Sequence, residues 1–274
     1  MKTTEVIAEA EKIAAKFGFL SREIFFHTLS PFSRAHTFRT WAGLPSSGSF
    51  DIASGSKDIF YLSRRRRCAL NTAPVPLRNL AYVDHDNHVA RMYLMLRRTG
   101  LVRRAWSEQE LGMSPWDAME ILGSDNLGKI PDLVVDLSVG EDTLRVAIEI
   151  ERRRKSRLRY DHVALGYLRM AKVDLIIYGC DSRAIEREVR RAFSGEVFRS
   201  KRRQPGFYDL EAFRTTGLEV PFEIFGRRYS LIEFLRLATK SVPPNSQSTK
   251  PLEFGDLNET SVSGFKNEKI KEAG

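Results

Sequence analysis

The stretch that decides the fold reads KIPDLVVDLSVGEDTLRVAIEIER, from Lys129 to Arg152. Two apolar runs flank a Gly-Glu-Asp tripeptide at 140–142, and apolar runs about a Gly-led turn are typical of a β-hairpin. If the turn has two residues, Asp132 lies directly opposite Glu149, with Cβ atoms about 5 Å apart on one face. Glu151 lies two residues further along the strand and therefore points to the same face. The sequence predicts three acidic side chains at one end of an apolar hairpin.

Carboxylates this close repel one another, and at least one pKa is expected to rise. A bound cation removes that penalty, and hard oxygen ligands suit Mg²⁺ or Mn²⁺. Two alternatives stay open. The acids pair instead with the basic run at 152–155 on a solvated sheet end, or a three-residue turn shifts the register and places Glu149 on the face opposite to Asp132.

Composition favours a polyanionic partner. The 274-residue, 31.3 kDa chain has a net charge of +9 and a pI near 9.6, which favours nucleic acid, with an anionic membrane surface as the alternative. Cys68 and Cys180 are isolated, as is usual in a reducing compartment. An apolar stretch of membrane-spanning length and a signal-peptide pattern are both missing, so we expect a cytoplasmic protein without a membrane segment.

Residues 1–70 predict a winged helix-turn-helix that binds double-stranded DNA. Apolar spacing and helix start signals indicate helices at 4–17, 21–29 and 32–44, followed by two short strands within 49–62. In that fold the third helix enters the major groove. The candidate DNA contacts are Arg34, His36, Thr37 and Arg39 on the third helix, Lys57 at the wing tip, and Arg64 and Arg65 in the arginine run that closes the domain. A small helical bundle without a groove to fill is the alternative, and the arginine run alone is also typical of a solvated segment.

Residues 71–240 predict an α/β domain with a mixed sheet, after a linker at 71–79. The helix at 84–98 begins with His85 and His88, which we expect to be surface or capping residues. The predicted elements are a strand at 101–106, an irregular or partly helical segment at 111–128, the hairpin, a helix at 156–172, a strand at 173–179, a helix from Ser182 to Phe193, a strand at 218–225 and a helix at 230–239. Residues 241–274 are rich in Pro, Ser, Asn, Glu and Lys and predict a disordered tail.

Two short motifs resemble those of the PD-(D/E)xK nuclease superfamily: Pro131-Asp132, then Glu149-Ile150-Glu151 before a helix. The usual lysine two residues after the Glu is replaced by Glu151. The order of motifs also looks like that of the replication-relaxation family, which includes MOBC-type conjugative relaxases and places a winged helix-turn-helix before a nuclease-like domain. The features that carry this resemblance are His85 at a helix start, Trp106-Ser107-Glu108, the two motifs above, and Arg159-Tyr160.

The resemblance implies a metal-dependent nick in one DNA strand at a transfer origin, without a covalent phosphotyrosine. Asp132 and Glu149 would bind Mg²⁺ or Mn²⁺, with the Ile150 carbonyl as a third ligand. Glu151 would be a general base or a second metal ligand. Lys155 would supply the charge of the missing lysine, or contact phosphate or solvent only.

Three functional hypotheses follow. The first is a relaxase-like endonuclease of a plasmid or integrative element, working with accessory mobilisation proteins. The second is a non-cleaving, sequence-specific DNA-binding accessory or regulatory protein with a degenerate nuclease fold. The third is a basic scaffold protein that binds DNA without a preferred site. Tyr160 is expected to pack at its helix start, with a nucleophilic role as the alternative.

Overall fold

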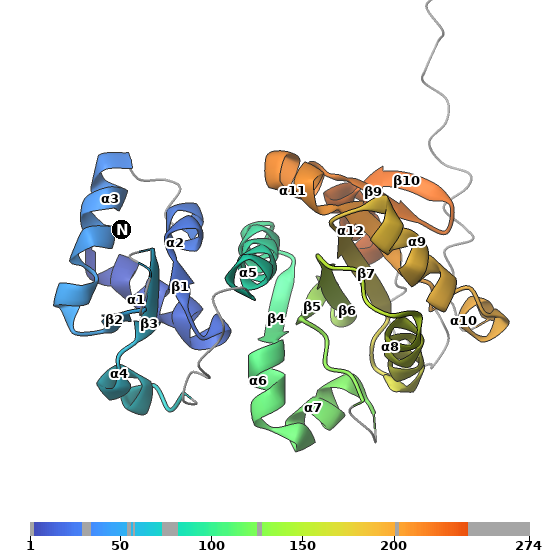
Figure 1. The fold of residues 1–274 in the computed structure, drawn as a ribbon, viewed down its shortest axis with the longest axis horizontal. Helices are drawn as coiled ribbons and strands as arrows, with labels where there is room; N and C mark the ends of the chain where they lie inside the picture. The colour runs from blue at the N-terminus through green and yellow to red at the C-terminus, as the bar shows by residue number, and fades with distance from the viewer. Residues whose placement is uncertain are drawn as a thin grey trace, which may run out of the picture.

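A seven-stranded mixed sheet forms the core of the larger, C-terminal part of the molecule (Figure 1). The computed structural model describes residues 3–28, 34–53, 56, 58–72, 82–124, 128–200 and 203–240. The strands are β4 (Val102–Ser107), β5 (Leu133–Val139), β6 (Asp142–Glu151), β7 (Leu175–Cys180), β8 (Gly206–Asp209), β9 (Pro221–Ile224) and β10 (Arg227–Ser230), in the spatial order β10-β9-β8-β7-β6-β5-β4. The pairs β6–β7 and β7–β8 are parallel and the other neighbours antiparallel, so the predicted mixed α/β class is confirmed.

The hairpin β5–β6 has the predicted register. Val139 pairs with Asp142 across a two-residue turn, and Leu133 pairs with Ile148 at the other end. Gly140 adopts φ +58°, a left-handed conformation that a Gly at the first central position of such a turn supplies at little cost. Asp132 immediately precedes β5, at the level of Glu149.

Helices cover both faces of the sheet, which explains why β5 is apolar on both of its sides. One face packs against α5 (Val83–Arg98), α11 (Leu210–Thr216), the short 3₁₀ helix η3 (Gly217–Glu219) and α12 (Leu231–Lys240). The other packs against α6 (Glu108–Met113), α7 (Pro115–Leu122), α8 (Arg157–Arg169), α9 (Arg183–Ala192) and α10 (Glu196–Ser200). None of the helices in the described ranges combines the length and apolar composition needed to cross a bilayer.

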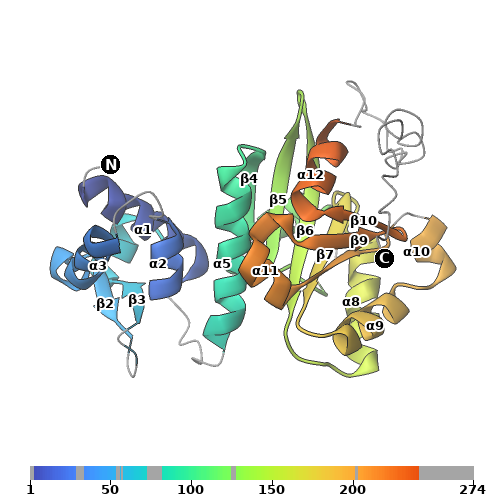
Figure 2. The ribbon, with the colours of Figure 1, turned by 90° about the horizontal axis from the view of Figure 1, so that it is seen from above.

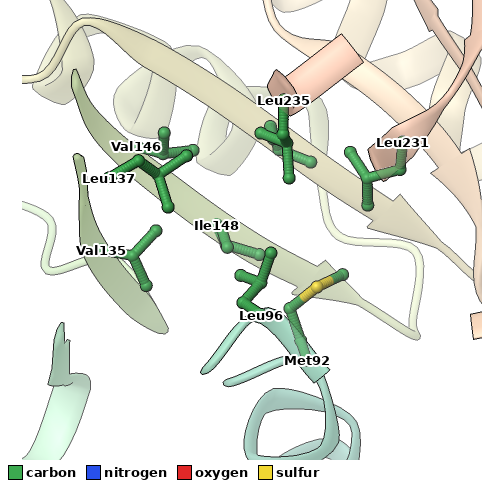
Figure 3. Close-up of a pocket in the computed structure, with 9 residues that line it drawn as sticks. Met92, Leu96, Val135, Leu137, Val146, Ile148, Leu231 and Leu235 are labelled. Carbon is green, nitrogen blue, oxygen red and sulfur yellow. The ribbon is translucent and has the colours of Figure 1, made fainter. Parts of the chain in front are cut away.

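A dry apolar core lies between α5, α12 and the sheet. Figure 3 shows side chains from both helices pointing toward β5 and β6. The side chains that meet there include Met92, Leu96, Val135, Leu137, Val146, Ile148, Leu231 and Leu235. The space between them does not admit a water molecule, so this region is packing and not a binding site.

The N-terminal segment contains the three predicted helices and the strand pair. Its elements are α1 (Thr3–Phe17), β1 (Leu20–Ser21), α2 (Arg22–Thr28), α3 (Arg34–Gly43), the 3₁₀ helix η1 (Pro45–Ser47), β2 (Phe50–Ile52), β3 (Ile59–Leu62) and α4 (Arg64–Ala69). The strands form a small sheet in the order β1-β3-β2. The Ser21 hydroxyl caps the start of α2, since it accepts a hydrogen bond from Ile24 N at 3.1 Å. The linker from 73 onward, Lys57 and the tail at 241–274 lie outside the described residues.

The N-terminal segment packs against α5 and the start of the sheet domain (Figure 2). The Phe17 and Tyr93 rings lie 5.6 Å apart between centroids. The Lys16 ammonium donates to Glu110 Oε2 at 2.6 Å and to the Ala105 carbonyl at 2.7 Å. The Ser107 hydroxyl donates to the Lys16 carbonyl at 2.6 Å. Polar and apolar contacts together attach this segment to the sheet domain.

Several elements escaped the sequence analysis. The segment at 111–128, predicted to be irregular or partly helical, contains α7 and the end of α6, whose start at Glu108 was not predicted. The elements β1, β8, α10, α11 and β10 were not expected. The unpredicted strands have two to four residues each, too few to produce a clear alternation of apolar and polar positions.

Gly206→Ala is expected to destabilise the sheet. A Cβ at this position in β8 would lie 2.0 Å from Phe222 Cζ, and that ring is fully buried, so it cannot move aside. We expect a loss of roughly 1–3 kcal/mol in the free energy of unfolding, measured by urea denaturation. Gly112→Ala in α6 is the matched control, because a Cβ there meets no atom within 4 Å. Equal midpoints for the two variants would contradict this packing.

Candidate functional site

Asp132 and Glu149 are buried side by side at the end of the hairpin. Asp132 is 8% exposed and Glu149 5% exposed. Asp132 Oδ2 accepts a hydrogen bond from Ile150 N at 2.8 Å. This bond holds the Asp132 carboxylate against the C-terminal end of β6. Glu149 Oε1 accepts from the hydroxyl of Tyr167, a buried residue of α8. The predicted approach of these two acids is therefore present in the structure.

Lys129 joins the two carboxylates. Its ammonium lies 3.1 Å from Glu149 Oε2 and 3.8 Å from Asp132 Oδ1. Gly166 lets α8 approach closely, because a Cβ at that position would lie 3.2 Å from Lys129 Cβ. One oxygen of each acid thus faces the same cation. Lys129 was not predicted as a site residue, although its position three residues before Asp132 could have indicated that it lies near the two acids.

His85 reaches the same site from the first turn of α5. Its Nε2 lies 3.1 Å from Asp132 Oδ2, and its Nδ1 lies 3.0 Å from Asp86 Oδ1. Burial opposes a charge on the imidazole, but the hydrogen bonds with Asp132 and Asp86 outweigh it and raise the pKa of His85 to about 10. The expectation that His85 is only a surface or capping residue was wrong. The histidine is a charged partner of Asp132.

The two carboxylates differ in proton affinity. Burial favours the protonated form of each, but for Asp132 the nearby Lys129 and His85 outweigh it and hold the pKa well below its ordinary value. For Glu149 burial prevails, supported by the charge of Asp132, and the pKa rises to about 7 despite Lys129 and Tyr167. The pair therefore combines a firmly ionised acid with one that exchanges a proton near neutrality, an arrangement common at functional sites.

Glu151 does not complete a three-carboxylate cluster. Its Oε2 lies 2.6 Å from Lys155 Nζ, so this acid pairs with the basic run, as the alternative interpretation had it. Within the described ranges, no group of three or more His, Cys, Asp or Glu side chains is arranged to hold a metal ion. The expected convergence of three acids on one ion is corrected to two acids that face Lys129. Glu151 and Lys155 form a separate ion pair beside them.

Tyr160 packs in α8 and is 2% exposed, as expected. Its hydroxyl accepts a hydrogen bond from Lys155 N at 3.1 Å. Burial raises the pKa of Tyr160 to about 12, even though this hydrogen bond acts in the opposite direction. A phenol that resists ionisation is a poor nucleophile at neutral pH, which disfavours the covalent alternative.

The candidate DNA contacts lie apart from the carboxylates, on α3 and α4. Arg39, Arg64 and Arg65 are exposed, whereas His36 is half-buried. Thr37 is only 3% exposed. A side chain packed inside the helical segment cannot reach a base edge, so Thr37 is withdrawn as a contact. The Arg34 side chain and Lys57 lie outside the described residues.

His88, expected at the surface, is 4% exposed. Burial lowers the pKa of His88 to about 4, and the charges of Arg214, Arg152 and Arg91 act in the same direction. His88 and these three arginines form a second polar cluster, one helical turn along α5 from His85.

The comparisons with family models, with curated proteins and with solved structures give no match to this chain.

Lys129→Met is expected to make the stability of the protein depend on divalent ions. The variant keeps most of the apolar stem but removes the cation between two buried acids, and breaking a buried ion pair costs about 3–5 kcal/mol. We expect a lower melting temperature by differential scanning fluorimetry and a partial recovery with Mn²⁺ or Mg²⁺. Lys12→Met is the control, because the Lys12 side chain is 72% exposed. Equal responses of both variants to Mn²⁺ would contradict a cation-binding position here.

His88→Gln is expected to flatten the loss of stability in acid. Above pH 6.5 His88 is neutral in both the folded and the unfolded chain, so it contributes no pH dependence. Between pH 6.5 and about 4 only the unfolded chain takes up this proton, which lowers the stability of the parent by up to about 1.4 kcal/mol per pH unit. Urea denaturation at several pH values measures the slope. His162→Gln, at an exposed position of α8, should retain the parental slope; a parental slope in His88→Gln would refute the assignment.

Proposed function

We propose that this chain is a metal-dependent DNA-nicking endonuclease, relaxase-like, that acts at a plasmid or integrative-element transfer origin. One observation carries the proposal: an oxygen of Asp132 and an oxygen of Glu149 face one cationic position at the end of the hairpin. Lys129 occupies this position, which a divalent ion would have to take from it. The sequence motifs around Asp132 and Glu149 add the resemblance to PD-(D/E)xK nucleases.

We further propose a winged helix-turn-helix at 1–70 and a PD-(D/E)xK-like domain at 71–240. The order α1, α2, α3, β2, β3 supports the first assignment. The antiparallel β5–β6 hairpin followed by α8 and the parallel strand β7 supports the second. Exposed Arg39, Arg64 and Arg65 would hold double-stranded DNA mainly through its phosphates.

The donor set fits a hard divalent ion such as Mg²⁺ or Mn²⁺. Asp132 Oδ1 and Glu149 Oε2 are the two carboxylate oxygens directed at Lys129, and Mg²⁺ is commonly bound by one or two carboxylates with water and substrate phosphate. Ile150 N donates to Asp132. Since the N–H and C=O of a strand residue point to the same side, the Ile150 carbonyl is a suitable third ligand. When bound, the ion would activate water and offset charge on the phosphate.

The surrounding residues have separate tasks in this proposal. His85 and the Ile150 amide orient Asp132, and Tyr167 orients Glu149. The Lys155 side chain is 31% exposed, so it can contact a phosphate from the solvent side, leaving Glu151 to accept a proton. Burial raises the pKa of Glu151 although Lys155 opposes the shift, which improves this carboxylate as a base.

A non-cleaving DNA-binding accessory or regulatory protein is the second candidate. The observation in its favour is that Lys129 already neutralises the carboxylate pair, so the fold is satisfied without a divalent ion. The missing lysine two residues after Glu149 also favours it. Both candidates would act on double-stranded DNA together with accessory mobilisation proteins.

Glu149→Gln is expected to lower nicking of supercoiled plasmid in Mg²⁺ or Mn²⁺ by on the order of 10²-fold or more, because it removes a ligand and its charge. The amide keeps the shape of the side chain and an oxygen for Tyr167. Relaxation of a plasmid that carries the cognate site, followed on agarose gels, gives the rate. Glu196→Gln is the control, since Glu196 is exposed in α10.

DNA binding, measured by gel shift, should remain near the parental level in both variants. A parent protein that binds its cognate site but never nicks it would support the regulatory candidate and refute the endonuclease. Binding that falls steeply with salt and shows no preferred sequence would instead support the basic scaffold protein.

A further inference from the structure

A cluster of arginines surrounds His88 on the face of α5 that continues from His85. His85, His88 and Arg91 follow one another at intervals of three residues and therefore share a helix face. Arg152 directly follows Glu151 at the end of β6. Arg214 belongs to α11, which lies beside α5 in Figure 2, and Arg91 Nη2 donates to the Arg214 carbonyl at 2.6 Å. Residues distant in sequence thus meet between α5, α11 and the end of the hairpin.

Two donors in this cluster are buried without a partner. The Nε atoms of Arg91 and Arg152 are inaccessible to solvent and have no hydrogen-bond partner in the part of the chain that the structure describes. The Arg91 side chain is only 12% exposed. A buried unsatisfied donor costs free energy, and more so on a charged group, so protein acceptors do not fully satisfy these two guanidinium groups. The lowered pKa of His88 indicates that the surroundings disfavour further positive charge.

The acidic partners of these arginines are exposed. Asp84 lies 3.2 Å from Arg152, Glu23 lies 3.7 Å from Arg91, and Glu211 lies 3.6 Å from Arg214. Their side chains are 64%, 41% and 75% exposed, respectively. Exposed ion pairs contribute little to stability, whereas arginine binds phosphate through two parallel hydrogen bonds. A phosphate can therefore replace these carboxylates.

We infer that Arg91, Arg152 and Arg214 form a phosphate-binding site around His88 that holds a phosphodiester group of the bound nucleic-acid strand. The site adjoins the carboxylates, because Arg152 is the next residue after Glu151 and His85 contacts Asp132. It would fix the strand beside the group to be cut. The assignment to a strand rests on the proposed function, whereas binding of phosphate itself does not.

The first test uses the full chain in EDTA, so that nicking has no part in it. Fluorescence anisotropy with a fluorescein-labelled single-stranded oligonucleotide gives the affinity. Arg91→Gln and Arg214→Gln should each weaken binding about tenfold, the loss of a charge-assisted contact. Arg228→Gln is the matched control, since its side chain in β10 is 81% exposed. Equal losses in all three variants, or no loss in any, would overturn the site.

The second test uses the parent protein, so misfolding of a variant cannot affect its result. Inorganic phosphate and the oligonucleotide are each titrated into the metal-free parent while the His88 ring signals are followed by NMR. Both should shift these signals and raise the pKa of His88 from about 4, because the anion offsets the arginine charges. If inorganic phosphate shifts the His88 signals but the oligonucleotide does not, the proposal that the site holds a nucleic-acid strand is overturned. If neither ligand shifts these signals, the phosphate-binding site itself is overturned. A parent that shows these shifts but never nicks DNA refutes only the endonuclease.

Discussion

The ion pair of Lys129 with Asp132 and Glu149 is the interaction on which the rest of the site depends. Two carboxylates buried at the end of an apolar hairpin repel each other, and the Lys129 ammonium between them offsets this repulsion. The same requirement makes the position suitable for a divalent ion, since both kinds of cation need converging oxygens. The structure shows the neutralisation by Lys129, and metal binding is the second use that we propose for the same geometry.

Helices on opposite faces of the sheet contact the two acids. From one face, α5 brings His85 to Asp132; from the other, α8 brings Tyr167 to Glu149. The charged histidine and the phenol create different surroundings for two acids of similar chemistry. One therefore remains ionised while the other exchanges its proton near neutral pH. An asymmetric pair of this kind is better suited to chemistry than two equivalent surface acids.

The arginine cluster around His88 extends the polar face of α5 away from the carboxylates. It concentrates positive charge where the sheet end, α5 and α11 meet, whereas the neighbouring acids Asp132 and Glu149 are paired with Lys129. In the proposed function, the arginines would hold the backbone of a phosphodiester strand and the acids would bind the ion that acts on one of its phosphates. The neighbouring N-terminal segment, attached through Lys16 and Phe17, would offer duplex DNA a second basic surface.

By itself the sequence predicted the mixed α/β class and, for a two-residue turn, the hairpin register and the approach of Asp132 to Glu149, because apolar runs about a Gly-led turn act between residues close along the chain; the structure decided for the two-residue turn over the three-residue one. Only the tertiary structure decided that Lys129 faces both acids, that His85 reaches Asp132, and that Glu151 turns to Lys155. Those contacts depend on the irregular backbone before β5 and on helices packed from distant segments. The burial of Thr37 and His88 could not be predicted from the sequence either, because the exposure of a polar side chain depends on tertiary packing and not on the local sequence pattern.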